Sequence, residues 1–176
     1  MPKNRIAVIG AGPIGLEAAL LARQRGLEVT VLERGRVASH VRKWQHVTLF
    51  SPFEMNASRW GRIAVEEHGT GLPDASAFVS GAEFLERYLL PLSELETLRE
   101  VIRKDTEVVA VSREAFWKGD LIGKPDRLES PFRLLLRSGP EQREGVLNAD
   151  FVLDCSGVFG SHNWLGIRSD LTCRPL

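Results

Sequence analysis

The chain has 176 residues, and its 23 basic and 23 acidic side chains give a formal net charge of zero. This length is enough for one domain with a hydrophobic core and too short for two of ordinary size, so we expect a single domain over residues 1–176. The sequence has no basic stripe, no basic amphipathic helix and no apolar run long enough to span a membrane. These features exclude nucleic acid and membranes as expected partners and leave a small molecule.

No signal peptide is expected, because the apolar run after Arg5 is too short for one. The two cysteines, Cys155 and Cys173, do not form a Cys-x-x-Cys pair. We interpret them as free thiols in a reducing compartment, which predicts a cytoplasmic protein. No metal site is predicted, because metal-ligand spacing is missing among the four histidines: His40, His46, His68 and His162.

The chain begins with a strand, a glycine-rich turn and a helix. Residues 5–9 are a short apolar run typical of a buried strand. They lead into the turn Gly-Ala-Gly-Pro-Ile-Gly at 10–15, and residues 16–25 then predict a helix that Gly26 ends. Residues 27–32 predict a second strand.

Each position of this turn suits the binding of a dinucleotide. Gly10 permits a tight turn, Gly12 lets the backbone approach a pyrophosphate, and Gly15 lets the helix pack against the sheet. Pro13 fits the first helical turn, because its missing N–H would have no partner there. The helix N-terminus then offers free N–H groups and a positive dipole end to phosphates, and Ile14 beside it is counted among the expected cofactor-binding residues.

Glu33 ends the second strand, 18 residues after Gly15 (33 − 15), close to the spacing of about 20 expected of an acid that binds ribose hydroxyls. A carboxylate there repels a 2′-phosphate, which argues against NADP at this site and leaves FAD or NAD. Arg34 either lies beside an adenine ring or belongs to a solvated basic run over residues 34–44. The alternative for the whole motif is a glycine turn in another kind of α/β protein.

The middle of the chain predicts loops and helices. The pattern after Glu33 is irregular. The apolar side chains of Met55, Trp60 and Ile63 either cover a core or form the wall for a flat ring such as isoalloxazine. Residues 81–90 predict a helix that Pro91 interrupts. Residues 92–101 predict another helix, with Ile102 continuing its spacing.

Four strands are expected in the last third. Those over residues 106–113, 132–137 and 144–147 form a small antiparallel meander. Residues 149–154 predict an apolar strand that ends in the small-residue turn 155–157.

Together these features resemble the FAD-binding domain of glutathione-reductase-like two-dinucleotide-domain flavoproteins, which include flavin monooxygenases and pyridine nucleotide-dependent FAD oxidoreductases. The resemblance rests on the glycine turn with Glu33 and Arg34, on strand 106–113, and on the strand that leads to Gly157. It implies an α/β fold of three layers, with a Rossmann-like parallel sheet and an antiparallel β-meander. It also implies that FAD is held by its ADP half, with Val109 at the adenine and Gly157 at the pyrophosphate, and that NAD(P)H is the electron donor.

The same resemblance predicts that the chain is truncated, frameshifted or part of a split enzyme. Members of the family carry a second Gly-x-Gly-x-x-Gly for NAD(P)H and a later Gly-Asp segment for the ribityl chain, and neither is present here. Residues 167–176 do not resemble the start of a domain. Truncation would expose apolar surface, so we expect self-association.

Three functions remain open from the sequence. The first is a flavin-dependent, monooxygenase-like oxidoreductase or its FAD-binding fragment, which the long insertion between Glu33 and the strand at Val108 favours. The others are an NAD-dependent dehydrogenase domain and a non-catalytic dinucleotide-binding remnant. The sequence identifies no catalytic acid, base or nucleophile, and a disulphide-reductase role is not expected because Cys155 has no partner at usable spacing.

Overall fold

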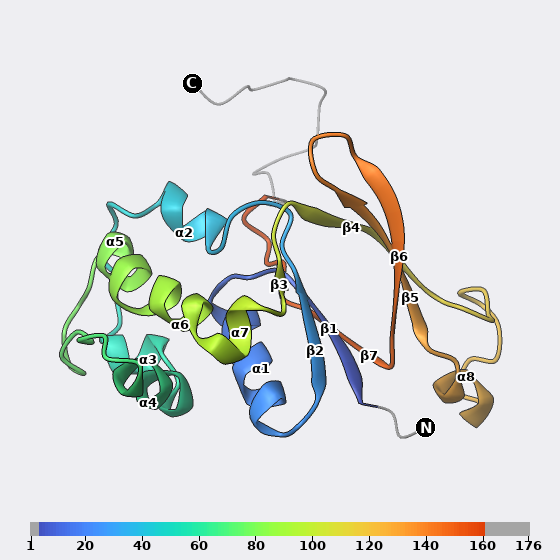
Figure 1. Ribbon diagram of the computed structural model, residues 1–176, viewed down its shortest axis with the longest axis horizontal. Helices are drawn as coiled ribbons and strands as arrows, with labels where there is room; N and C mark the ends of the chain where they lie inside the picture. The colour runs from blue at the N-terminus through green and yellow to red at the C-terminus, as the bar shows by residue number, and fades with distance from the viewer. Residues whose placement is uncertain (1–3, 161–176) are drawn as a thin grey trace.

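The structure, a computed structural model, describes residues 4–160. The expectations for His162, Cys173 and residues 167–176 lie outside this range. A parallel sheet in the order β3-β2-β1-β7 forms the middle of the molecule (Figure 1). Its strands are β1 (Arg5–Ile9), β2 (Glu28–Leu32), β3 (Ile102–Arg103) and β7 (Phe151–Asp154).

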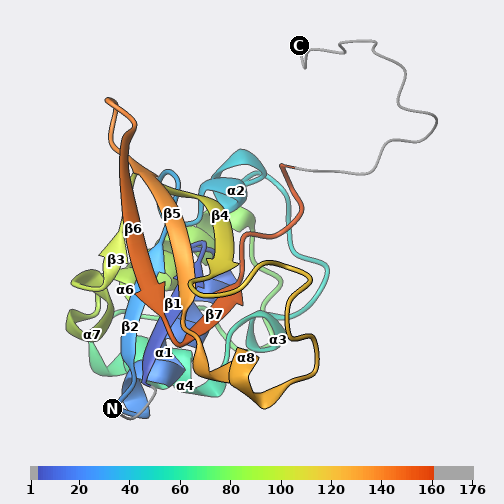
Figure 2. The ribbon, with the colours of Figure 1, turned by 90° about the vertical axis from the view of Figure 1, so that its right-hand side faces the viewer.

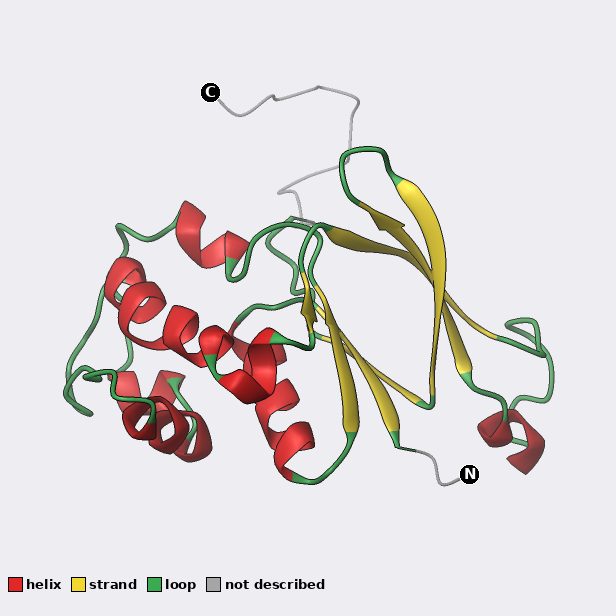
Figure 3. Ribbon diagram, in the orientation of Figure 1, coloured by secondary structure: helices red, strands yellow, loops and turns green. Residues whose placement is uncertain are grey.

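Helices cover one face of this sheet (Figure 3). Helix α1 (Pro13–Gln24) connects β1 to β2, and Gly26, with φ +76°, follows its C-terminal cap as the sequence predicts. The other helical segments between β2 and β3 are α2 (Ser39–Lys43), α3 (Phe53–Asn56), α4 (Arg59–Glu67), α5 (Gly81–Phe84), η1 (Leu85–Leu89), α6 (Leu90–Glu94) and α7 (Glu96–Arg99).

The predicted meander covers the opposite face of the sheet (Figure 2). It consists of β4 (Thr106–Arg113), β5 (Phe132–Ser138) and β6 (Arg143–Ala149), paired antiparallel in this order. A short helix, α8 (Pro125–Glu129), lies in the connection between β4 and β5. The molecule therefore has the three layers that the sequence predicts: helices, parallel sheet and meander.

Successive side chains of β1 point to opposite faces of the sheet and so belong to two different apolar clusters. Ile6 and Val8 belong to the large apolar cluster with the helices, whereas Ala7 packs with Leu134 and Leu136 of the meander. This is the period of two expected of a strand that is buried on both faces. The small Ala7 side chain lets the meander approach the sheet closely.

Pro91 does not interrupt the helix around it, contrary to the sequence-based prediction. The chain stays helical from α5 through α6, because η1 widens the backbone by one residue: the N–H of Leu90 bonds to the carbonyl of Leu85. A π-type turn of this kind places Pro91 in a new first turn, where its missing N–H leaves no partner unsatisfied. The helical break falls instead at Leu95, whose ψ is 138°.

Two strand assignments also differ from the prediction. Ile102 does not extend a helix: it forms β3, where the Val31 N–H bonds to Val101 O and the Glu33 N–H bonds to Arg103 O. A strand of two residues is too short to show alternation in a sequence. The final strand begins at Phe151, because Ala149 completes β6 and pairs with Phe132.

The apolar side chains of residues 34–61 do not form one cover. Phe53 is buried against Phe84 and Tyr88, with ring centroids 6.4 and 5.5 Å apart. Met55 and Trp60 are instead 74% and 54% exposed. The first alternative, that such residues cover a core, therefore holds for Phe53 and fails for Met55 and Trp60. The second, a wall for a flat ring, stays a prediction.

Candidate dinucleotide site

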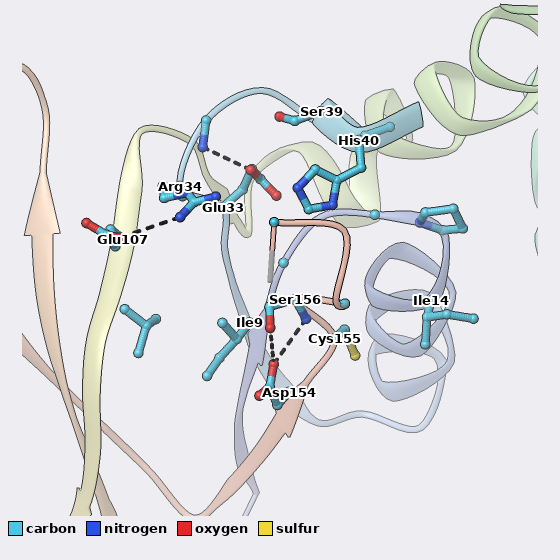
Figure 4. A pocket seen from close by; sticks show the side chains of 18 of the residues that line it. Ile9, Ile14, Glu33, Arg34, Ser39, His40, Glu107, Asp154, Cys155 and Ser156 are labelled. Carbon is cyan, nitrogen blue, oxygen red and sulfur yellow. Dashed lines mark hydrogen bonds and ion pairs between the residues drawn. The ribbon is translucent and has the colours of Figure 1, made fainter. Parts of the chain in front are cut away.

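A pocket of about 760 Å3 opens at the carboxyl ends of β1, β2 and β7, where β4 and α2 form its sides (Figure 4). Its size is within the range of small-molecule sites, and the carboxyl edge of a parallel sheet is where such sites form. All the predicted cofactor-binding residues except Gly15 line it: Gly10, Gly12, Pro13, Ile14, Glu33, Arg34, Val109 and Gly157.

The three glycines of the turn meet different surroundings. Gly10 has φ +99°, and a Cβ there would lie 2.8 Å from the carbonyl oxygen of Cys155. A Cβ on Gly15 would lie 1.9 Å from the carbonyl oxygen of Gly10, so α1 packs directly on the turn. A Cβ on Gly12 would meet no atom within 4 Å, because this position faces the open pocket. Gly15 thus shapes the site from behind.

The N-terminus of α1 is left free to meet an anion. Gly12 is its N-cap residue and supplies no side chain, Pro13 begins the helix, and the first turn contains no acidic residue. The N–H groups of Ile14 and Gly15 therefore have no capping side chain, and they lie at the positive end of a twelve-residue helix.

Glu33 is tied to the glycine turn. One carboxylate oxygen accepts a hydrogen bond from the Ala11 N–H at 2.8 Å, and the other accepts one from the Gly35 N–H at 2.9 Å. Each oxygen can accept a further bond, so these contacts leave capacity for a ligand hydroxyl. The carboxylate lies at the pocket wall, where the sequence places the ribose-binding acid.

Val109 and Arg34 form the side of the pocket that faces the meander. Val109 is the extra residue of a β-bulge, because Val108 pairs with Leu136 and Ala110 with Leu135. A bulge re-aims a strand, and Val109 is 41% exposed at the pocket. The Arg34 guanidinium lies 3.8 Å from the Glu107 carboxylate, which links the end of β2 to β4.

The turn after β7 closes the floor of the pocket. The Cys155 N–H bonds to the carbonyl of Ile9, and both the N–H and the hydroxyl of Ser156 donate to Asp154 Oδ1. These hydrogen bonds from Ser156 lower the pKa of Asp154. Gly157 has φ +67°, a conformation that glycine adopts without strain.

Residues 4–160 contain one cysteine, Cys155, and its thiol is free. Burial, with a smaller contribution from the charge of Asp154, raises the pKa of this thiol and disfavours the thiolate. These surroundings fit a structural thiol.

Several pocket residues escaped the sequence analysis, among them Ser39, His40 and Lys43 of α2. From the sequence, residues 34–44 are interpreted as a basic run with a solvated face. Only five residues make up α2, which is too short for a helical period, so no sequence signal placed it over the glycine turn. The sequence predicts Glu107 and Asp154 as parts of strands, and the structure confirms this. It also places both at the pocket, which the strand pattern does not indicate.

Residues 4–160 contain neither a metal cluster nor a membrane-spanning helix. No group of three or more His, Cys, Asp or Glu side chains is arranged to hold a metal ion there. None of the helices in this range combines the length and apolar character needed to cross a bilayer.

The parallel sheet, the glycine turn and the meander define a Rossmann-like domain of the flavoprotein type. The family model described as pyridine nucleotide-disulphide oxidoreductase matches residues 7–118, and the chain belongs to this family. This identification agrees with the relationship that the sequence motifs indicate.

Solved structures with the same fold include the bacillithiol disulfide reductase Bdr (YpdA) from Staphylococcus aureus, with a TM-score of 0.64 and 19% identity over 98% of this chain and 44% of that one. OTEMO in complex with FAD and NADP has a TM-score of 0.62 and 19% identity, over 94% of this chain and 27% of its own. A curated relative, lysine-specific histone demethylase 1 homolog 3 from Arabidopsis thaliana, is 30% identical over 94% of this chain. The chain spans 11% of that relative's length.

Proposed function

We propose that this chain binds FAD by its ADP half and serves as the FAD-binding part of a monooxygenase-like oxidoreductase. The observation that carries the proposal is the open space at Gly12 beside the uncapped N-terminus of α1. A backbone that no side chain covers, at the positive end of a helix, fits a pyrophosphate. When bound, FAD would accept a hydride from NAD(P)H and supply the redox chemistry.

The chain's own residues would bind and orient the dinucleotide. The N–H group of Ile14 at the start of α1 would meet the pyrophosphate, with Gly157 on its other side. The Glu33 carboxylate would accept hydrogen bonds from ribose hydroxyls and repel a 2′-phosphate. Val109 and Arg34 would border the adenine.

The meander supports FAD over NAD as the ligand at this site. The bulge at Val109 turns β4 toward the pocket, and the resemblance to FAD-binding domains assigns the adenine contact to this residue. An NAD-dependent dehydrogenase domain is the second candidate, and Glu33 favours it equally because NAD also has a free 2′-hydroxyl. A non-catalytic remnant is the third.

We propose monooxygenase-like rather than disulphide-reducing chemistry on the basis of the chain's own cysteines, because the structural neighbours include both OTEMO and a bacillithiol disulfide reductase. Disulphide reduction needs two cysteines beside the flavin. Within the described residues Cys155 has no second cysteine near it, and the raised pKa of its thiol works against the thiolate that exchange requires.

An absorption spectrum of the purified protein, taken with and without added FAD after removal of free ligand, tests the proposal. We expect a retained flavin band that Gly12→Val abolishes. Stabilisation by NAD without a retained flavin would favour the dehydrogenase. If the protein retains neither ligand, the proposal is overturned and the non-catalytic remnant is favoured.

A further inference from the structure

Helix α2 is held directly against the glycine turn. The Ala38 N–H, just before α2, bonds to the carbonyl of Ala11 at 3.0 Å. Ala38 has φ 54°, a left-handed conformation that a residue with a Cβ rarely adopts, and it is buried together with Val41. Two buried side chains and a backbone hydrogen bond thus fix α2 against the glycine turn, at the side of the pocket.

Two basic side chains of α2 line the pocket, those of His40 and Lys43. Figure 4 shows the His40 ring extending from α2 toward the glycine turn. The ring lies 5.0 Å from that of Phe159, and Lys43 Nζ lies 5.7 Å from the same ring. Within residues 4–160, neither side chain forms an ion pair with a carboxylate.

The other charged groups of the pocket already have partners. The Glu33 carboxylate is held by two backbone N–H groups, and Asp154 by Ser156. Arg34 faces Glu107, so its charge is partly offset. On the side of the turn, the dipole of α1 offers only about half a positive charge to a ligand phosphate.

We propose that His40 and Lys43 hold the diphosphate of the bound dinucleotide together with the N-terminus of α1. This inference rests on the proposed function and deepens it, because it assigns the selection of a diphosphate over a monophosphate to α2. A cationic group beside a phosphate forms stronger hydrogen bonds than a neutral donor, and the rigid placement of α2 limits the entropic cost. The Phe159 ring beside both side chains restricts their rotation.

Three variants and a control test the inference. Lys43→Gln removes the charge. His40→Phe keeps the ring contact with Phe159 but removes the nitrogen donors, and the third variant combines both changes. Arg36→Gln is the matched control, because it removes one positive charge from an exposed side chain outside the pocket, three residues before α2. Circular dichroism and thermal unfolding establish that each variant is folded.

Dissociation constants for FAD, ADP and AMP are then measured by calorimetry. We expect Lys43→Gln to weaken the affinity for FAD and for ADP by about tenfold, and His40→Phe to weaken it by about three- to tenfold. Both losses of affinity should become smaller at high salt. In the same variants the affinity for AMP should fall by about threefold or less. Arg36→Gln should change the affinity for FAD, ADP or AMP by no more than about twofold.

The outcomes separate the inference from the proposed function. If the wild-type protein retains FAD and ADP but the α2 variants bind them as tightly as it does, the inference fails and the proposed function stands. Equal losses for AMP and ADP would also overturn selection of the diphosphate. If the wild-type protein binds neither FAD nor ADP, both fail.

Discussion

The carboxylate of Glu33 accepts a hydrogen bond from the backbone N–H of Ala11 at 2.8 Å, which joins the end of β2 to the glycine turn after β1. Ala11 is held on its other side by the Ala38 N–H, which donates to its carbonyl. One acidic side chain therefore contributes to the shape of the turn as well as to the expected recognition of ribose, and its replacement should affect both.

Glu33→Gln should change nucleotide choice and weaken the fold. The neutral amide still accepts a hydrogen bond but no longer repels a 2′-phosphate, so the ratio of affinities for ADP and its 2′-phosphorylated form should move toward the latter. We expect a loss of about 1–2 kcal/mol in the free energy of unfolding, because glutamine has one acceptor oxygen: one of the two bonds from Ala11 and Gly35 becomes neutral and the other is lost. Calorimetry and thermal unfolding measure the two effects. An unchanged affinity ratio would contradict the role assigned to Glu33.

Substitutions at two glycines of the turn should have opposite consequences. Gly12→Val should leave stability within about 1 kcal/mol, because the new side chain enters open space, and should abolish binding of FAD. Gly15→Ala should destabilise the fold by about 3 kcal/mol or more, because its Cβ would overlap the Gly10 carbonyl. Denaturant unfolding with the flavin spectrum distinguishes the two. A stable Gly15→Ala protein would show that the turn can move away from α1.

Asp150 connects β7 to β1, and its contribution should depend on pH. It accepts hydrogen bonds from the N–H of Asn4 and from the backbone and guanidinium of Arg5, with 2.8 Å between Oδ1 and the nearer guanidinium nitrogen. These bonds lower the pKa of Asp150 to about 2. The folded protein thus keeps the carboxylate charged where the unfolded chain, with a carboxyl pKa of about 4, binds a proton.

This stabilisation is complete above pH of about 4 and is lost as the pH falls toward 2. Asp150→Asn should therefore cost about 1–2 kcal/mol of unfolding free energy at neutral pH and progressively less in acid. Urea unfolding at several pH values measures the difference. Asp74→Asn, at an exposed position, is the control. A difference between wild type and Asp150→Asn that stays constant down to pH of about 2 would contradict the assignment.

Tyr88 should resist ionisation while the protein is folded. It is fully buried, and its hydroxyl donates to Glu17. Burial, followed by the bond to Glu17, raises the pKa of Tyr88 above the ordinary value of 10.0. Since the unfolded chain ionises first, stability should decline as the pH rises above 10.0.

Tyr88 is the single tyrosine of the sequence, so its ultraviolet titration can be followed directly. The tyrosinate signal should appear only with unfolding. Tyr88→Phe should lower the free energy of unfolding by about 1–2 kcal/mol at neutral pH, because Glu17 then keeps only its hydrogen bonds from Ser58. Titration of the folded protein near pH 10.0 would show that the phenol reaches water.

We also propose self-association through exposed apolar side chains. Phe50, Met55 and Phe78 are 94%, 74% and 60% exposed, and the Leu49 N–H bonds to Val79 O, which brings the segments of Phe50 and Phe78 together. Replacing both phenylalanines by serine should lower the average mass in sedimentation experiments at high concentration. A wild-type protein that stays monomeric over the same concentration range would refute the proposal.

The sequence alone determined the elements whose signal is local. The first strand, the glycine turn, the position of Glu33 and strand β4 follow from alternation, from glycine conformations and from the spacing of a βαβ unit. These are properties of neighbouring residues, so they can be predicted from the sequence without tertiary information. The meander and the final strand were recognised for the same reason, with boundaries displaced by one or two residues.

Only the tertiary structure decided what depends on contacts between distant segments. The bulge that presents Val109 arises from pairing with β5, and β3 exists because β2 offers it backbone partners. The position of α2 depends on the burial of Ala38 and Val41 and on the hydrogen bond from Ala38 to Ala11, which is far away in the chain. From the sequence, His40 and Lys43 therefore belong to an ordinary basic run. Packing, and not composition, determines which side of a short helix faces a pocket.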